Sequence, residues 1–252
     1  KRDLLTTGEM ALEDLYEFME GRPCALLLTA FSPLALAHQF LLRPDADDRV
    51  SVLMTEELFV GERLLPVEAV TVERVDAAGR TRLSLQADEP ALRLLADTAP
   101  QTPQGYVVAA QYTRLQTPGK AHVDVPTRND GFSKALFRLE EVDARYGQYG
   151  QVVGHRLELV PLSHPAVTPL RVRVLFDGQP LATRITATHE GFVRQADGPR
   201  APVTVNSDAE GVAELPLERG GLWLLRVRHA EVAAEADALA YTANANLVFR
   251  RP

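Results

Sequence analysis

The residues in this sequence best suited to chemistry are His38, His122 and Asp124. His38 follows Ala35-Leu36-Ala37, and small residues one and three positions before a cut are what signal peptidase requires. Cleavage after Ala37 would make His38 the first residue, so that its free amine and one imidazole nitrogen could bind the same metal ion. Such nitrogen ligands suit Cu(II) and Ni(II).

A chelating terminus needs further ligands from the fold, and the segment His122-Val-Asp124 could supply them. Alternate residues of a strand face the same way, so this imidazole and carboxylate would converge. The sequence therefore predicts a metal site made of His38, His122 and Asp124. The alternative is that His38 is simply exposed and that His122 and Asp124 form a solvent-facing ion pair.

The other histidines are weaker candidates for metal ligands because none lies near a chelating terminus. His229 and Glu231 repeat the spacing of the predicted site, and His189 adjoins Glu190. Two more histidines flank the run Leu157-Glu-Leu-Val-Pro161, where neighbouring prolines indicate hydrogen bonding within loops; they are His155 and His164.

No catalytic template is present in the sequence. It lacks a Gly-x-Ser-x-Gly elbow, a Walker loop, a Gly-x-Gly-x-x-Gly turn and a His-Glu-x-x-His helix. The carboxylate pairs Glu56-Glu57 and Glu140-Glu141 are adjacent in sequence, so their side chains splay apart on any regular element. We therefore predict that the protein is not an enzyme and that it has no cofactor other than the metal ion.

An export signal is predicted in the leader, residues 1–37. The uncharged run from Cys24 to Ala37 follows Arg22 and is too short for a stable membrane anchor, which needs about 20 apolar residues. Cys24 is the only cysteine, so the processed protein would have no disulfide. These features predict a periplasmic protein. The alternative is that residues 10–37 form a buried helix of a cytosolic protein.

The charge pattern gives no sign of a nucleic-acid partner. The 252 residues carry a net charge of −7, and no basic block interrupts them. Binding to phosphates needs clustered lysine and arginine.

Beyond His38 the hydrophobic pattern has the period of two that is typical of strands. We expect a mainly β protein with two antiparallel β-sandwich domains, at 38–128 and 155–252, the second being Ig-like. A short helical connector is expected at 129–154. The expected strands are 49–54, 69–75, 81–86, 106–112, 120–125, 156–160, 170–176, 184–189, 203–206, 212–217, 222–229 and 246–250.

Three motifs carry a resemblance to a known family: Leu157-Glu-Leu-Val-Pro161, the turn Asp177-Gly-Gln-Pro-Leu181, and Ser207-Asp-Ala-Glu-Gly211 followed by Gly221-Leu-Trp223. With them, residues 37–252 resemble a bacterial periplasmic domain-of-unknown-function family whose members are described as nickel- or cobalt-transport-associated components. The last two motifs also resemble the transthyretin-like or carboxypeptidase-regulatory-like β-sandwich, a module that usually serves as a scaffold.

The resemblance implies an exported protein that acts near metal or nutrient uptake, with a membrane transporter or receptor as its partner. The first hypothesis is an exported periplasmic protein that binds or delivers a transition metal, Ni, Co or Cu, as a transport accessory. The alternative is a non-metal interaction module that docks on an outer-membrane transporter or an envelope component.

Overall fold

The computed structural model describes residues 39–55, 59–100, 105–118, 125–139, 149–193, 201–233 and 238–252. Residues 36–252 group into one compact unit. The described residues are mainly β and contain no α-helix, which confirms the predicted fold class at this level.

In the described ranges the strands and a short 3-10 helix follow in chain order: β1 (Gln39–Pro44), β2 (Arg49–Thr55), η2 (Val67–Ala69), β3 (Val70–Asp76), β4 (Gly79–Arg82), β5 (Gln86–Asp88), β6 (Arg93–Asp97), β7 (Tyr106–Gln116), β8 (Thr127–Phe137), β9 (Leu157–Pro161), β10 (Leu170–Phe176), β11 (Gln179–Pro180), β12 (Arg184–His189), β13 (Val203–Asn206), β14 (Val212–Leu215), β15 (Gly221–Val232) and β16 (Ala240–Arg251).

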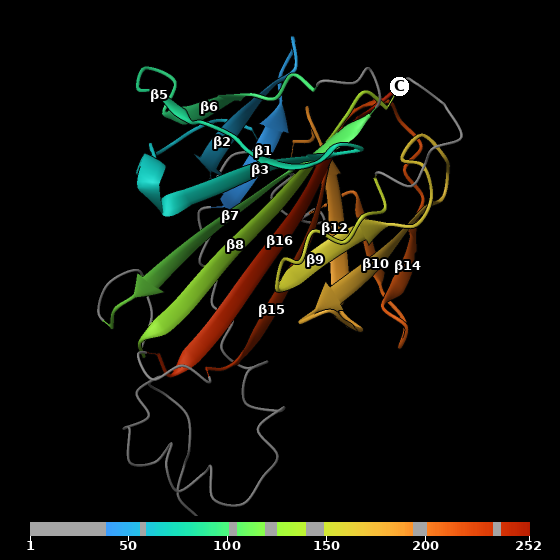
Figure 1. Cartoon of the computed structure of the whole chain (residues 1–252). Coiled ribbons are helices and arrows are strands. Elements are labelled where there is room, and N and C mark those ends of the chain that lie inside the picture. Colours follow the sequence, from blue (N-terminus) through green and yellow to red (C-terminus); the bar gives the residue numbers. More distant parts are fainter. Residues whose placement is uncertain are drawn as a thin grey trace, which may run out of the picture. The chain divides into compact units, whose positions relative to one another are not determined.

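The strands form three sheets. Sheet A has the order β1-β2-β6-β5, and sheet B has the order β13-β12-β15-β16-β8-β7-β3-β4. Sheet C has the order β11-β10-β14, with β9 also paired to β10. Figure 1 shows the long strands β7, β8, β16 and β15 side by side, with sheet A near their upper part and β9, β10 and β14 beside their lower part.

The alternation of residues in β15 gives sheet B two buried faces, because successive side chains of a strand point to opposite sides. Leu222 and Leu224 pack with Leu41 and Leu53 of sheet A. Trp223 and its neighbours on the other side pack with the residues of sheet C. Sheet B is therefore the shared middle layer of two cores, and Trp223 is buried in one of them.

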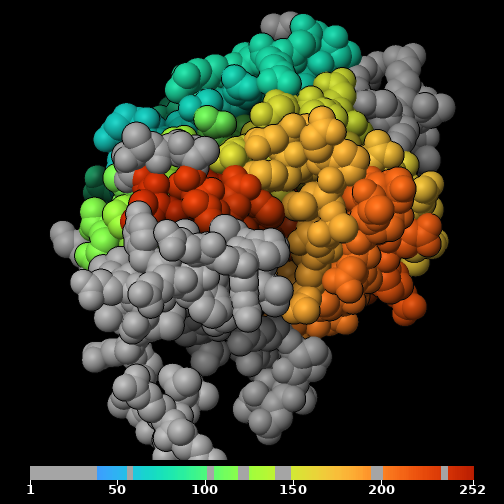
Figure 2. All heavy atoms as spheres, turned by 90° about the horizontal axis from the view of Figure 1, so that it is seen from below, coloured from blue at the N-terminus to red at the C-terminus, as the bar shows by residue number. Residues whose placement is uncertain are grey.

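Strand β8 joins the two regions that the sequence analysis separates. It pairs antiparallel with β7 and parallel with β16, so that Phe132 lies opposite both Gln111 and Ala245. The predicted boundary between residues 128 and 129 falls inside this strand. Figure 2, seen from below, shows the segments coloured yellow to orange gathered on one side of the red β16.

The predicted helical connector at 129–154 is wrong where these residues are described. Thr127–Phe137 is a strand, and all of its residues from Asp130 to Phe137 are buried. A strand buried on both faces has a nearly continuous apolar run rather than a clean period of two, and such a run resembles a buried helix. The charged residues Asp130 and Lys134 interrupt this run and make its sequence look more like that of a helix.

The predicted turns are confirmed. Asp177 and Gly178 have φ values of 49° and 75°, the left-handed pair that a tight hairpin needs, and they join β10 to β11. In the turn before β14, the Asp208 carbonyl accepts a hydrogen bond from the Gly211 N–H at 3.0 Å. The first turn fixes the register of β10 and β11 in sheet C, and the second joins β13 of sheet B to β14 of sheet C.

The part of the chain that the structure describes includes no helix with the length and apolar character needed to span a membrane.

Candidate functional site

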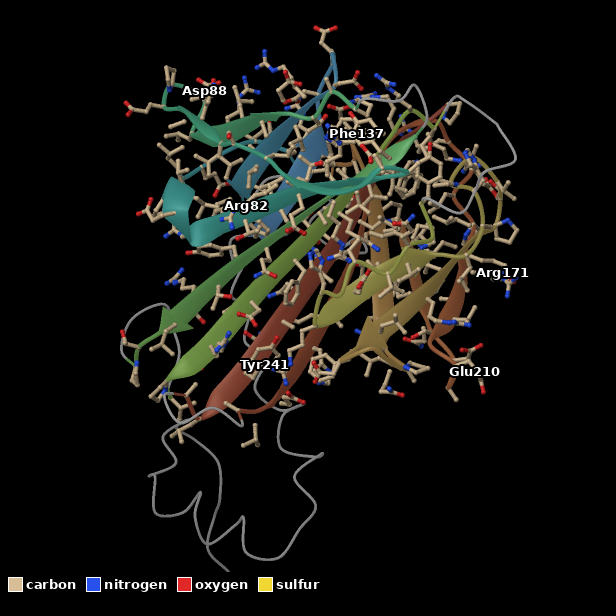
Figure 3. The ribbon with its side chains drawn as sticks, in the orientation of Figure 1. Arg82, Asp88, Phe137, Arg171, Glu210 and Tyr241 are labelled. Atoms are coloured by element: carbon tan, nitrogen blue, oxygen red, sulfur yellow. The ribbon has the colours of Figure 1, made fainter. Side chains whose placement is uncertain are left out.

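A polar pocket of about 210 Å³ lies on sheet B, on the face that carries sheet C. It is lined by Thr71, Glu73, Arg80, Ala109, Gln111, Val153, Gly154 and His155. Figure 3 labels Arg82, which marks β4 at this edge of the sheet. The walls are therefore strands β3, β4 and β7 and the loop that precedes β9.

The strand walls are fixed by pairing in sheet B. Thr71 lies opposite Gln111, and Glu73 lies opposite Ala109. All four point to the same face because cross-strand partners share a side of the sheet. Arg80 places a guanidinium nitrogen 3.9 Å from the Glu73 carboxylate, and both side chains remain partly exposed.

The loop wall is held by the buried carboxylate of Glu158. Its Oε1 accepts a hydrogen bond from the Val153 N–H at 2.8 Å, and its Oε2 accepts from Gly154 at 3.0 Å and His155 at 3.2 Å. Three successive backbone donors thus converge on one side chain. The loop that lines the pocket is anchored through Glu158 rather than through regular strand pairing.

Glu158 also forms an ion pair with Lys134, whose Nζ lies 2.7 Å from its Oε1. Both residues are 1 % exposed, and Lys134 Nζ also donates to the Gln151 carbonyl at 3.3 Å. Burial lowers the pKa of Lys134, and the charge of Glu158 opposes that shift. The pair connects β8 to β9 directly behind the pocket.

His155 is the pocket residue with the most altered proton affinity. Burial lowers its pKa to about 4, and the positive charges of Lys134 and Arg80 act in the same direction against the attraction of Glu158. Its ring stacks on Phe132 with 5.0 Å between centroids. At neutral pH the imidazole is uncharged, so it can donate one hydrogen bond and accept another.

The pocket thus combines an uncharged imidazole, a carboxylate, a guanidinium, an amide and a hydroxyl. These groups can hydrogen-bond a polar solute from several directions. The volume is below the roughly 300–1,000 Å³ of pockets that hold drug-sized ligands, so a ligand would have to be small. Covalent catalysis needs a nucleophile beside a base that a third group orients. The residues that line this pocket do not form such a set.

A second polar cluster lies at the lower end of β16, around Tyr241 (Figure 3). The Arg156 guanidinium lies 4.0 Å from the centre of the Tyr241 ring and forms ion pairs with Asp177 at 2.9 Å and Glu231 at 2.8 Å. Glu231 also lies 3.4 Å from His229 Nε2. The His229 and Glu231 pair is therefore real, but the arginine already engages its carboxylate.

The predicted metal ligands His38, His122 and Asp124 lie outside the described residues. Within the described ranges, no three or more histidine, cysteine, aspartate or glutamate side chains group as a metal site would need. The four described histidines contact different aromatic rings; the pairs are His155 with Phe132, His164 with Tyr149, His189 with Trp223 and His229 with Phe176.

The sequence analysis missed Glu73, Arg80, Lys134 and Glu158 as site residues. A signal existed for two of them, because Lys134 and Glu158 each stand within an apolar strand segment, Phe132–Phe137 and Leu157–Pro161. A charge in such a segment is rarely buried without a partner. Glu73 and Arg80 carried no such signal, since charges that alternate along an edge strand are common on solvated surfaces.

Comparison with known proteins gives one match and one negative result. The sequence profile of the family described as Domain of unknown function (DUF4198) matches residues 35–231. No curated protein matches the sequence. The match covers more than half of the chain, including the pocket, the Lys134 and Glu158 ion pair and both turns of sheet C. The chain therefore belongs to the DUF4198 family of domains of unknown function.

Proposed function

We propose that the protein is an exported binding protein, without catalytic activity, that holds a small polar solute in the pocket beside His155. The observation that carries this proposal is the fixed wall of Val153, Gly154 and His155, whose three N–H groups all bind Glu158. A loop held in this way loses little conformational freedom when a ligand arrives, which favours binding.

The charges in the pocket indicate the kind of solute. Glu73 and Arg80 lie 3.9 Å apart, farther than a close hydrogen-bonded pair, so each can turn to a ligand group of opposite charge. The uncharged His155 adds a donor and an acceptor without net charge. This set suits a small molecule that carries both a cationic and an anionic group, such as a free amino acid.

A thermal-shift screen with single free amino acids, dicarboxylates and monosaccharides tests the proposal. We expect at least one zwitterionic amino acid to raise the midpoint of unfolding. The variants His155→Gln and Glu73→Gln should each weaken binding of that compound about tenfold, which is the loss of one or two hydrogen bonds to charged groups. Calorimetry with the same compound measures the change.

Glu214→Gln is the matched control. Glu214 lies 3.6 Å from Arg171, so its substitution also breaks an exposed ion pair between an arginine and a glutamate. This pair is on sheet C, whereas Glu73 and Arg80 are on sheet B. Binding should be unchanged in this variant. If no compound binds, or if Glu214→Gln weakens binding as much as Glu73→Gln, the pocket is not the site.

A second candidate function is the binding or delivery of Ni, Co or Cu through His38, His122 and Asp124. One observation favours it. Strand β1 runs along β8 in the same direction, since Gly131 faces the Phe40 side chain and Ser133 Oγ binds the Leu42 N–H at 2.9 Å. Gln39, which follows His38, therefore lies toward the same end of β8 as Thr127. This is the end of β8 that is nearer in sequence to His122 and Asp124.

Calorimetry with Ni(II), Co(II) and Cu(II), on protein that begins at His38, tests this second function. We expect binding at about micromolar affinity or tighter, and a loss of at least a hundredfold in His38→Ala because a chelate loses one of its two nitrogens. The variant His164→Ala is the control and should bind as the parent does. If His38→Ala binds the metal ion as tightly as the parent does, His38 is not a chelating terminus.

We further propose that the protein works in the periplasm as an accessory to nickel or cobalt transport, and that residues 155–252 are a transthyretin-like module. Sheet C packed on the β12 to β16 part of sheet B supports the module. The alternative is an interaction module for an outer-membrane transporter or envelope component. Release of the predicted leader after Ala37, measured by mass spectrometry of the exported protein, tests the location.

A further inference from the structure

The face of sheet B that turns away from sheet C carries arginine and amide side chains around and beyond the start of β1. Leu222 and Leu224 of β15 pack on sheet A, and the next residues on that side of the strand are Arg226 and Arg228. Arg226 donates a hydrogen bond to Gln39 at the start of β1. Figure 1 shows the long strands continuing past sheet A in this direction.

Four arginines share this face, which we call the arginine face; they are Arg114, Arg184, Arg226 and Arg228. The register places them there: Thr186 lies opposite Arg226 in the neighbouring strand, and Arg184 is two residues before it. Arg184 and Arg228 are exposed, and Arg114 and Arg226 are partly exposed. Residues so distant in sequence meet only because β7, β12 and β15 lie in one sheet.

Among the described residues, no carboxylate neutralises the charges of these arginines. None of the four forms an ion pair within the described ranges, whereas Arg156 on the opposite face binds two carboxylates. The cross-strand partners are amides instead, since Arg114 lies opposite Asn129, Arg226 opposite Asn246 and Arg228 opposite Asn244. These are the positions at which an opposite charge would stabilise the pair.

Polar atoms on the same face are left without hydrogen bonds. The side-chain oxygens of Asn246 and Thr242 and the Nε of Arg226 are buried and have no partner among the described residues. Asn246 is 3 % exposed, and its amide nitrogen donates to the Phe40 carbonyl at 2.7 Å. Buried polar atoms of this kind are rare, and ordered water, an ion or a bound ligand can satisfy them. Asn246 lies under β1, so Arg226 and Thr242 are the two of these residues nearer the exposed part of the face.

We propose that the arginine face binds an acidic polysaccharide, a chain of sugars that carries carboxylates. Guanidinium groups bind carboxylates in a bidentate manner, and the amides and hydroxyls between them match sugar hydroxyls as donors and acceptors. The partly or fully exposed positions of the three central strands on this face are Arg226, Arg228 and Ala230 of β15, Thr242 and Asn244 of β16 and Asn129 of β8. Gly131, Ser133 and Asn246 lie under Phe40 and Leu42 of β1.

This composition distinguishes the proposed ligand from other anions. An acidic peptide needs apolar contacts for part of its affinity, and a lipid surface needs aromatic or aliphatic side chains that insert. The exposed positions of the three central strands offer neither, and the two aromatic rings beside them, Phe40 and Tyr112, stack on each other. The net charge of −7 repels polyanions at long range, so binding has to arise from local contacts on this face.

Binding of oligogalacturonate to the full chain tests the proposal, with neutral dextran, polyglutamate and phosphatidylglycerol vesicles as comparison probes. We expect oligogalacturonate to bind, to bind more weakly as salt is added, and to lose about tenfold in affinity in the double variant Arg184→Gln/Arg228→Gln. Calorimetry at low and physiological ionic strength measures both effects.

Arg171→Gln/Arg173→Gln is the matched control, because it removes two exposed arginines from sheet C, where Arg171 projects away from sheet B (Figure 3). It should leave the affinity unchanged. The proposal is overturned if dextran binds as well as oligogalacturonate, if polyglutamate or the vesicles bind more tightly, or if both double variants weaken binding equally. The pocket beside His155 is on the other face, so the result is independent of the function proposed above.

Discussion

Replacing Glu158 with alanine is expected to lower the free energy of unfolding by about 3–5 kcal/mol, the typical result of removing one partner of a buried ion pair. The substitution leaves the ammonium of Lys134, which is 1 % exposed, without its carboxylate. It also removes the acceptor for the N–H groups of Val153, Gly154 and His155. Denaturant unfolding followed by Trp223 fluorescence measures the loss.

Two comparisons make this expectation specific. Glu214→Ala removes a carboxylate from an exposed pair with Arg171 and should cost no more than about 1 kcal/mol. Lys134→Met should cost less than Glu158→Ala, because the carboxylate that remains still accepts three backbone hydrogen bonds. If Glu158→Ala does not fold, Glu158→Gln supplies the measurement. Equal effects of the Glu158 and Glu214 substitutions would contradict the role of Glu158 as the anchor of the pocket loop.

Stability is expected to fall by about 2–3 kcal/mol more in the parent than in His155→Gln as the pH decreases from 6.5 to 4, since one pKa unit corresponds to about 1.4 kcal/mol. Burial lowers the pKa of His155 from 6.5 to about 4. Between these values the unfolded state binds a proton at this histidine and the folded state does not, so acid favours unfolding. The expected loss is below the full shift because the ring is partly exposed.

The comparison of the two proteins isolates the histidine. The carboxylates and the other imidazoles titrate in both, so their effects cancel in the difference between the two stability curves. Denaturant midpoints measured at several pH values between 4 and 7.5 give these curves. Parallel curves for the parent and His155→Gln would show that the imidazole titrates normally, and the pocket would then hold a charged ring in mild acid.

These two expectations concern one structural unit. Glu158 fixes the loop, the loop places His155 against Phe132, and the resulting burial keeps the imidazole uncharged. Glu158→Gln loosens the loop, which acts to raise the pKa of His155, and it removes the attraction of the carboxylate, which acts to lower that pKa further; the direction of the shift shows which effect is larger. An NMR titration of the His155 ring in Glu158→Gln would detect that shift.

The strands were predicted well where one face is buried and the other is solvated. Residues 170–176, 184–189 and 203–206 are strands with the predicted bounds. In β10 the buried Leu170, Val172 and Val174 alternate with the exposed Arg171 and Arg173, which gives an unambiguous period. The turns at Asp177-Gly178 and Asp208-Gly211 were equally visible, because glycine supplies backbone angles that other residues avoid.

Prediction failed for β8, which is buried on both faces. Its pairing with β16 joins residues more than 100 positions apart, and nothing local in either segment indicates the partner or the parallel direction. The anchoring of the pocket loop depends on where β8 lies relative to β9, since Lys134 comes from β8 and Glu158 from β9. A charged residue in an apolar run showed that a partner must exist, but not which residue it is.

The sequence by itself determined the mainly β class, most of the strand positions and the turn chemistry, because these follow from the spacing of apolar residues and from the local geometry of glycine. Only the tertiary structure decided that sheet B is shared by two cores, that Glu158 reaches Lys134, and that Arg114, Arg184, Arg226 and Arg228 lie on one face. Burial and charge proximity depend on which distant strands pair, and that choice is made by the packing of whole sheets rather than by any segment alone.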